Sequence, residues 1–290
     1  MTTPIIPVRR DLSFYLPTDK ISRWHYGGLH CAHFFNSLSI FFPIGERLFM
    51  DSVRHYRDRV TDPTLQRDIN TFIGQEAMHG REHVEYNQVM LKAGLPVDKY
   101  EAVVGRHIGW TRKYLPKRIQ LSITIALEHV TAILADLVLR DSALLDQCEP
   151  HYAKLWQWHA IEETEHKAVA FDVYQTVFGK GPFAYLLRII PFLITNLFFW
   201  SLVLRFHIGL VASEKQLFNL RGWIAVFNML WVSPGVLRRI VPHWFDYFKP
   251  SFHPWDHDNR NLLRQIDSIQ QEAELFEEEN TKQGVLAATA

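Results

Sequence analysis

The stretch that most constrains this chain is His159-Ala-Ile-Glu-Glu-Thr-Glu-His166. In a helix, His159, Glu163 and His166 stand at i, i+4 and i+7, and they therefore share one face. Trp156 and Ala160 extend that face with apolar side chains, so the three polar groups are expected to point into the interior. A buried carboxylate and two buried imidazoles are unfavourable without a partner. A divalent metal ion is a suitable partner, because both groups are good ligands for iron, manganese or zinc.

Helical periodicity organises the first two-thirds of the chain. It predicts a helix over about residues 29–60, kinked or restarted at Pro43, and further helices over about 64–93, 99–114, 117–146 and 150–179. No alternating strand pattern of useful length occurs up to this point. We therefore expect an all-α fold.

The changing character of the sequence divides the chain into four segments. We expect an N-terminal arm at 1–27, a metal-binding helical bundle at 28–180, an apolar helical extension packed on the bundle at 181–282, and a flexible tail at 283–290. Residues 184–212 are apolar enough to approach a membrane span, but Arg188 and Pro191 are among the residues that interrupt the run. We expect this run to be buried or membrane-interfacial, with a homodimer that hides it as a third alternative.

Polar residues recur on the inward faces of four of these helices. Two single glutamates, plus a Glu-x-x-His pair on each of two other helices, form the ligand set of a di-metal site in a four-helix bundle. Two cations a few ångströms apart repel, so several anionic ligands must surround them, and histidines complete each coordination sphere. The predicted metal ligands are Glu46, Glu76, His79, Glu128, Glu163 and His166, with His159 as a seventh.

Three further residues are candidates for supporting roles. His83, one turn after His79, is interpreted as a group behind the ligands, an alternative ligand or a surface histidine. Glu162 lies off the inward face, so we expect it to be solvated or to support a ligand. Asp136 is expected to hydrogen-bond a ligand histidine, as residues around metal sites often do.

The ligand motifs resemble those of the ferritin-like di-iron carboxylate superfamily. This resemblance implies a ferritin-like four-helix bundle with a di-iron site and additional C-terminal apolar helices. The His-x-x-x-Glu-x-x-His pattern of residues 159–166 is similar to the last ligand helix of p-aminobenzoate N-oxygenase-type di-iron enzymes.

Short motifs along the sequence are also similar to those of another family. Asp11-Leu-Ser-Phe14, Gly74-Gln-Glu-Ala-Met-His79 and Glu162-Glu-Thr-Glu-His166 resemble a bacterial family labelled as predicted metal-dependent hydrolases. The resemblance extends over about residues 8–270.

Three hypotheses for function follow. The first is a dioxygen-activating di-iron oxygenase or hydroxylase, acting on a small or apolar substrate and supplied by an external electron donor. Its cofactor would be two iron ions, with manganese or a mixed metal pair as alternatives. The second is a binuclear metal-dependent hydrolase, in which an activated water attacks an ester, amide or phosphoester. The third is a non-catalytic, iron-handling ferritin-like protein.

Composition limits the partners and the setting. Lysine plus arginine equals aspartate plus glutamate, at 31 each, which gives no electrostatic reason to expect nucleic acid. The two cysteines form no CxxC pair, and the N-terminus carries no long apolar segment typical of a secretory signal. We expect a cytoplasmic protein with a small-molecule or lipid-like substrate, and with peripheral membrane contact through 184–212 as an alternative.

Overall fold

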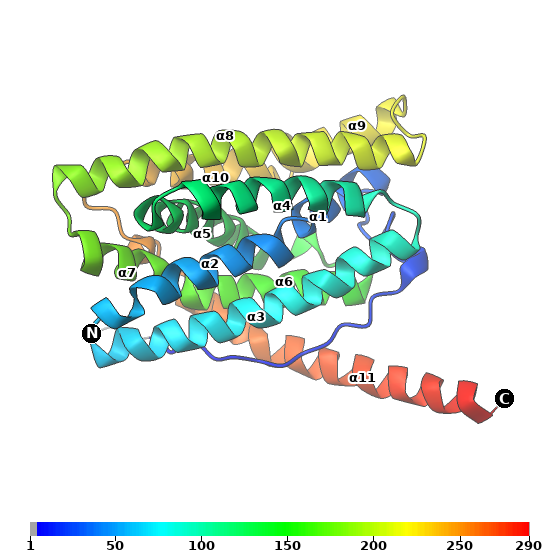
Figure 1. Ribbon diagram of the computed structural model, residues 1–290. Coiled ribbons are helices and arrows are strands. Elements are labelled where there is room, and N and C mark those ends of the chain that lie inside the picture. Colours follow the sequence, from blue (N-terminus) through cyan, green and yellow to red (C-terminus); the bar gives the residue numbers. More distant parts are fainter. Residues whose placement is uncertain (1–4, 290) are drawn as a thin grey trace.

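The regular structure of this protein is helical (Figure 1). A computed structural model describes residues 5–289, with side chains described as far as residue 282. Within these residues there are helices and turns but no strands, so the all-α prediction is confirmed. Whether the arrangement is ferritin-like stays a prediction.

Eleven α-helices make up most of the described chain. The first seven are α1 (Leu29–Ser39), α2 (Phe42–Tyr56), α3 (Pro63–Lys92), α4 (Val97–Tyr114), α5 (Lys117–Arg140), α6 (Pro150–His166) and α7 (Val169–Phe178). The remaining four are α8 (Pro182–Ser213), α9 (Leu220–Phe227), α10 (Val236–Asp246) and α11 (Ile266–Thr289). The predicted tail at 283–290 concerns residues whose side chains lie outside the description.

Two of the expected helices are interrupted. The helix predicted over 29–60 with a kink or restart at Pro43 is two helices, α1 and α2, and Pro43 lies in the first turn of α2, so the structure has the restart. A proline is tolerated there because the first-turn N–H groups have no partner within the helix. The helix predicted over 150–179 ends at His166 and restarts at Val169. Between them, the buried ammonium of Lys167 donates to the carbonyl oxygen of His257.

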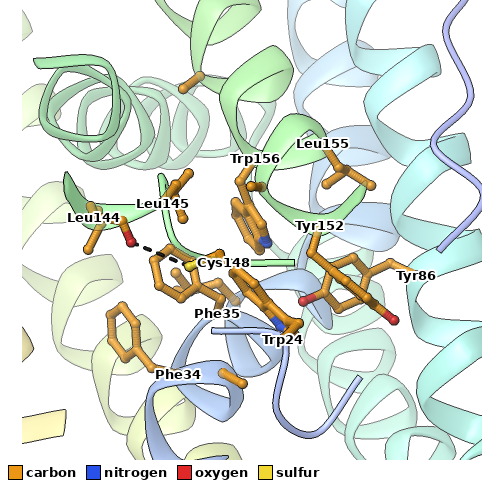
Figure 2. Close-up of a cluster of buried hydrophobic side chains, with 14 of the residues drawn as sticks. Trp24, Phe34, Phe35, Tyr86, Leu144, Leu145, Cys148, Tyr152, Leu155 and Trp156 are labelled. Atoms are coloured by element: carbon orange, nitrogen blue, oxygen red, sulfur yellow. Dashed lines mark hydrogen bonds between the residues drawn. The ribbon is translucent and has the colours of Figure 1, made fainter. Parts of the chain in front are cut away.

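Four helices surround the polar interior. α2 packs against α3 and α5, α5 packs against α6, and α3 also contacts α6. α8 lies across α1 and α5, and the N-terminal arm runs along α3 (Figure 1). At the α1 end of the bundle, aromatic rings fill the core, with Trp24 stacked on Tyr152 at a centroid distance of 5.5 Å (Figure 2). These packed layers position α2, α3, α5 and α6 around one point.

One side of α8 stays exposed. Leu197 and Phe218, the latter in the turn after α8, are 70% and 94% exposed. Three segments are long and apolar enough to cross a membrane, judged by length and composition: Lys117–Arg140, Pro182–Ser213 and Leu220–Asp246. The predicted apolar run is therefore packed on the bundle along one side and uncovered along the other.

We call the exposed apolar side chains of α8 and of the segment that follows it the apolar face. It comprises Phe183, Leu186, Ile190, Leu193, Ile194, Leu197, Phe198, Leu204 and Ile208 of α8, followed by Phe218, Leu220, Ile224, Phe227, Trp231 and Val232.

Three histidines in or just before helices α1 and α8 are buried: His25, which precedes α1, His33 of α1 and His207 of α8. Desolvation lowers the pKa of His25 to about 4, that of His33 to about 3 and that of His207 to about 4. Their neutral forms are therefore favoured in the folded protein. The stability that these neutral imidazoles contribute is fully present above pH 6.5, the ordinary pKa of histidine. It is lost as the pH falls towards the pKa values of the folded state.

We expect acid to destabilise the protein through these histidines. Between pH 7.5 and 5, His207 alone should remove about 2 kcal/mol from the free energy of unfolding, given a folded pKa of about 4. The His207→Gln variant should lose correspondingly less over the same interval. Urea denaturation of metal-free wild type and variant at both pH values measures this difference. Equal losses would show that His207 is not neutral and buried in the folded state.

Candidate metal centre

The seven predicted ligands lie together in the interior. They come from α2 (Glu46), α3 (Glu76 and His79), α5 (Glu128) and α6 (His159, Glu163 and His166), and each is at most 4% exposed. Helical spacing explains why they face inward. Glu46 shares its face with the buried Phe49 and Val53, and Glu76 follows the buried Phe72 by one turn.

The ligand atoms form two compact groups that share no residue, and a third group, of Glu76, His79 and Glu163, overlaps both. One group contains Glu46, His79 and His159, and the other contains Glu76, Glu128 and His166. Within each group the potential ligand atoms all lie within 4.8 Å of one another. The groups combine residues from different motifs. His166 Nε2, for example, lies 3.1 Å from Oε1 of Glu76, which belongs to the other Glu-x-x-His pair.

Glu163 connects the two groups. Its Oε1 lies 3.2 Å from His159 Nε2 and 3.7 Å from His79 Nδ1. Its Oε2 lies 3.7 Å from His166 Nε2 and accepts a hydrogen bond of 2.5 Å from Thr131 Oγ1. One carboxylate therefore faces both groups, as a ligand that bridges two cations would.

A glycine makes room for one of the carboxylates. A Cβ atom at Gly80 of α3 would lie 3.1 Å from Glu46 Oε2, which is closer than ordinary van der Waals contact. The missing side chain lets α2 bring Glu46 close to α3. The Glu-x-x-His motif of α3 and the glycine that follows it therefore serve the same site.

Unsatisfied polar atoms show that the residues fit a metal ion. Both carboxylate oxygens of Glu46, Glu76 and Glu128 are buried without a hydrogen-bond partner among the described residues, as are both ring nitrogens of His79 and Nε2 of His159 and His166. Buried polar atoms are nearly always satisfied, so such a concentration needs an explanation. Carboxylate oxygens and imidazole nitrogens aimed at one another are the donor set that divalent metal ions take.

The buried carboxylates also need a cation to compensate their charge. Burial raises the pKa of Glu46 and Glu128 well above the usual range, and neighbouring carboxylates, Glu76 and Glu163, raise it further. Burial opposes ionisation of Glu163 as well, but the adjacent imidazoles of His159 and His166 outweigh it and hold the pKa of Glu163 well below its usual range. Without a metal ion, protons must compensate the carboxylates. A metal ion would replace those protons, since ligands bind metal in their deprotonated form.

A chain of hydrogen bonds orients His159 from behind. Asn87 Nδ2 donates to the Glu101 carboxylate, so the Asn87 oxygen faces Ser39, whose hydroxyl donates to it. The Ser39 oxygen then accepts from His83 Nδ1, at 2.9 Å, and His83 Nε2 accepts from His159 Nδ1, at 3.1 Å. His159 Nε2 is left with a free lone pair that faces Glu163 and the centre. His83 therefore lies behind a predicted ligand.

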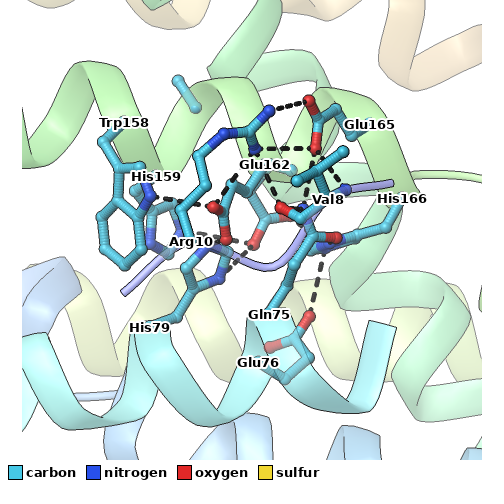
Figure 3. A network of polar contacts seen from close by, with 12 residues as sticks. Val8, Arg10, Gln75, Glu76, His79, Trp158, His159, Glu162, Glu165 and His166 are labelled. Carbon is cyan, nitrogen blue, oxygen red and sulfur yellow. Dashed lines mark hydrogen bonds and ion pairs between the residues drawn. The ribbon is translucent and has the colours of Figure 1, made fainter. Parts of the chain in front are cut away.

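A second chain orients His166. Gln75 Nε2 donates to Glu165 Oε2, at 2.8 Å, and to the Val8 carbonyl, at 3.1 Å, so its side-chain oxygen is free to accept (Figure 3). It accepts from His166 Nδ1 at 3.0 Å. This leaves the lone pair on His166 Nε2, which faces Glu76. Hydrogen bonds of this kind determine which nitrogen can bind metal and where the ring points.

The N-terminal arm completes the support. Arg10 donates to Glu165 at 2.7 Å and to Glu162 at 3.3 Å (Figure 3). Glu162 also accepts from Trp158 Nε1, and its Oε2 lies 3.3 Å from His79 Nε2. Glu162 is fully buried, so the expectation of a solvated side chain is wrong and that of a supporting one agrees with these contacts.

Asp136 does not have the expected position. It accepts hydrogen bonds from Asn259 Nδ2 and Arg140 Nε, and among the described residues it contacts no predicted ligand histidine. Eight residues separate Asp136 from Glu128, which places it about 12 Å further along α5 at 1.5 Å per residue. The expected hydrogen bond to a ligand histidine is therefore wrong, because Asp136 lies too far along α5 from the centre.

Other supporting residues were missed by sequence reasoning. Gln75 directly precedes Glu76, and its position beside a motif was a signal that could have found it. Arg10 and Ser39 carry no comparable signal, because they reach the centre only when the arm and α1 fold against the bundle. A further group, His243, Asp246 and His257, is half-buried outside the centre, and its side chains contact one another, with His257 Nε2 2.8 Å from Asp246 Oδ2.

The comparison with protein families agrees with this geometry. A family model described as "predicted metal-dependent hydrolase" matches residues 8–258. The chain belongs to this family. No curated protein and no solved structure matches the chain. The resemblance to the hydrolase family is thereby confirmed, and so is the expectation of a metal-dependent protein. The di-iron ligand pattern and the individual ligands stay predictions.

The same match overturns the first functional hypothesis. The oxygenase expectation depended on a ligand pattern shared with di-iron enzymes, and the family is instead one of metal-dependent hydrolases. A carboxylate and histidine set determines that metal binds but not which reaction follows. The second hypothesis, a binuclear hydrolase, agrees with the family. Dioxygen and an electron donor were expected only as partners of an oxygenase, and hydrolysis needs neither.

Gln75 provides a test of the supporting hydrogen bonds. We expect Gln75→Leu to weaken metal binding about 10- to 100-fold, the usual effect of removing the hydrogen-bond partner of a metal-ligating histidine. Isothermal titration of metal-free protein with Mn²⁺ measures it. Gln88→Leu, an exposed position on the same helix, is the matched control. Unchanged affinity in Gln75→Leu would mean that His166 needs no orientation from Gln75.

Proposed function

We propose that this protein is a hydrolase whose centre holds two divalent metal ions. The observation that carries the proposal is the pair of buried ligand groups joined by Glu163, in a chain that belongs to the metal-dependent hydrolase family. One ion would lie between Glu46, His79 and His159, the other would lie between Glu76, Glu128 and His166, and Glu163 would face both. Two iron ions are the proposed occupants, with manganese and zinc as alternatives that suit the same ligands.

The metal ions and the protein would make different contributions to catalysis. When bound, divalent ions supply Lewis-acid catalysis, because they polarise the scissile group and make water more acidic. The protein holds the imidazoles in one orientation through His83, Gln75 and Glu162. It also buries the centre, which strengthens every electrostatic interaction there.

The proposed reaction is hydrolysis of a carboxylic ester or amide. Water adds its oxygen to the acyl carbon, the bond from that carbon to oxygen or nitrogen breaks, and the alcohol or amine leaves with one proton. The second proton leaves the carboxylic acid that is formed. No electron acceptor is required.

Metal content and ester hydrolysis test the proposal together. We expect purified protein to contain about two metal ions per chain and to hydrolyse p-nitrophenyl acetate, since two ligand groups are present. The Glu163→Ala, His166→Ala double variant should lose both properties. The matched control, Glu85→Ala with His55→Ala, changes the same residue types at exposed positions. Full ester hydrolysis by a metal-free chain, or bound metal without hydrolysis of any ester or amide, would contradict the proposal.

We further propose that the apolar face contacts an anionic membrane. Residues 102–127, 183–213 and 215–245 contain five, two and four lysines and arginines, respectively, and no acidic residue. The chain as a whole is neutral, so cations are concentrated in the segments that carry or adjoin the apolar face. Exposed apolar side chains flanked by lysine and arginine are typical of surfaces that bind anionic lipid.

Vesicle flotation tests this contact. Wild type should float with vesicles that contain phosphatidylserine, and Leu197→Glu, Phe218→Glu should stay in solution, since both side chains are well exposed on that face. Leu275→Glu, at an exposed position of α11, is the control and should still float. If wild type does not float with vesicles and forms a dimer that Leu197→Glu disrupts, the apolar face is a dimer interface and the membrane proposal is wrong.

A further inference from the structure

An apolar cavity of about 50 Å³ adjoins the candidate metal centre. α1, α2, α5, α6 and α8 enclose it, and its walls include Phe35, Leu38, Leu134 and Val138. Phe42 also lines the cavity, and its ring centroid lies 4.5 Å from that of His159. This cavity, which we call the inner cavity, is therefore bounded on one side by a predicted metal ligand.

The polar groups of the inner cavity are confined to that end. Apart from the indole of Trp156, its polar side chains are Thr131 and His159. Both contact Glu163, Thr131 through a hydrogen bond of 2.5 Å and His159 at 3.2 Å. A molecule in this cavity would thus meet hydrocarbon along most of its length and a polar surface only beside the centre.

A larger apolar groove lies further out. It has a volume of about 540 Å³ and runs between α4, α5 and α8, with Ile108, Trp110, Leu127 and Leu202 among its walls. Ile194 and Phe198 line it and also belong to the apolar face. The groove, which we call the outer groove, therefore opens beside the surface proposed to contact lipid.

One side chain is common to both spaces. Phe199 of α8 lines the inner cavity and the outer groove. Its ring lies 5.1 Å from that of Phe41, which lines the outer groove, while the next residue, Phe42, lines the inner cavity. Phe199 and Phe41 therefore form the boundary between the two spaces. Both are half-buried and pack against the core.

We propose that the two spaces bind the acyl chain of the substrate, which is an ester or amide of a medium- or long-chain fatty acid. This inference rests on the proposed hydrolase function. The carbonyl end of the substrate lies in the inner cavity beside His159 and Thr131. The hydrocarbon chain passes between Phe41 and Phe199 into the outer groove.

The lining favours a hydrocarbon chain over other occupants. A peptide would bring backbone N–H and C=O groups into walls that offer few hydrogen-bond partners, and each unsatisfied group is unfavourable. The inner cavity is too small for a bulky ring system, whereas a chain of methylene groups needs only a narrow passage. Each buried methylene group contributes about 0.8 kcal/mol, so affinity should rise with chain length.

Two kinds of measurement test the proposal on the metal-loaded protein. The first is calorimetric binding of butanoate and dodecanoate, which requires no turnover. The second is hydrolysis of p-nitrophenyl acetate and p-nitrophenyl dodecanoate. The variants are Phe199→Trp, which enlarges the side chain between the two spaces, and Thr195→Trp, which fills the wall of the outer groove. Phe183→Trp, on the exposed start of α8, is the matched control.

The expected pattern separates the acyl site from the hydrolase proposal. Dodecanoate should bind at least tenfold more tightly than butanoate, and Phe199→Trp and Thr195→Trp should each weaken its binding at least tenfold, while Phe183→Trp has no effect. Wild type and Phe183→Trp should prefer the dodecanoate ester over the acetate ester, and both groove variants should lose that preference.

Two results would separate failure of one proposal from failure of the other. Equal affinity for both acids, with hydrolysis of the acetate ester intact, would overturn the acyl site and leave the hydrolase. Chain-length-dependent binding that responds to the groove variants, without hydrolysis of any ester, would support the acyl site and overturn the hydrolase.

Discussion

The burial of four carboxylates among three imidazoles is the constraint on which the rest of this structure depends. Glu46, Glu76, Glu128 and Glu163 come from four helices and meet where water is excluded. Carboxylates in such surroundings repel one another and lose their hydration, so the fold needs cations at this point. The unsatisfied oxygens are therefore a structural reason to expect metal, independent of any family resemblance.

The supporting hydrogen bonds extend this constraint outward. The chain from Glu101 to His159 and the chain from Glu165 to His166 each begin at a carboxylate and end at an imidazole lone pair. A carboxylate can only accept, which determines the direction of every hydrogen bond that follows. Arg10 compensates the charges of Glu162 and Glu165 and ties the N-terminal arm to the bundle. The centre thus explains why the arm is ordered beside α3 and α6.

Sequence reasoning predicted the helices and their inward faces because periodicity is a local property. The restart of the first helix was predicted from Pro43, which is a local signal. The break at residues 167–168 was not predicted, because Lys167 there makes hydrogen bonds with residues far away in the chain. The motifs alone do not say which glutamate lies beside which histidine. In the structure His166 Nε2 lies 3.1 Å from Glu76 of another helix and 3.7 Å from Glu163 of its own motif, because helix packing brings residues from different helices close together. The oxygenase expectation was wrong since ligand identity does not determine the reaction.

The sequence by itself determined that this protein is helical and that its helices carry carboxylates and imidazoles on apolar faces. Those properties follow from the spacing of residues within one helix. Only the tertiary structure decided that Glu163 faces both ligand groups, that Gln75 and His83 orient the rings, and that Phe199 separates two apolar spaces. These are relations between helices far apart in the chain, and they depend on packing geometry that no local pattern encodes.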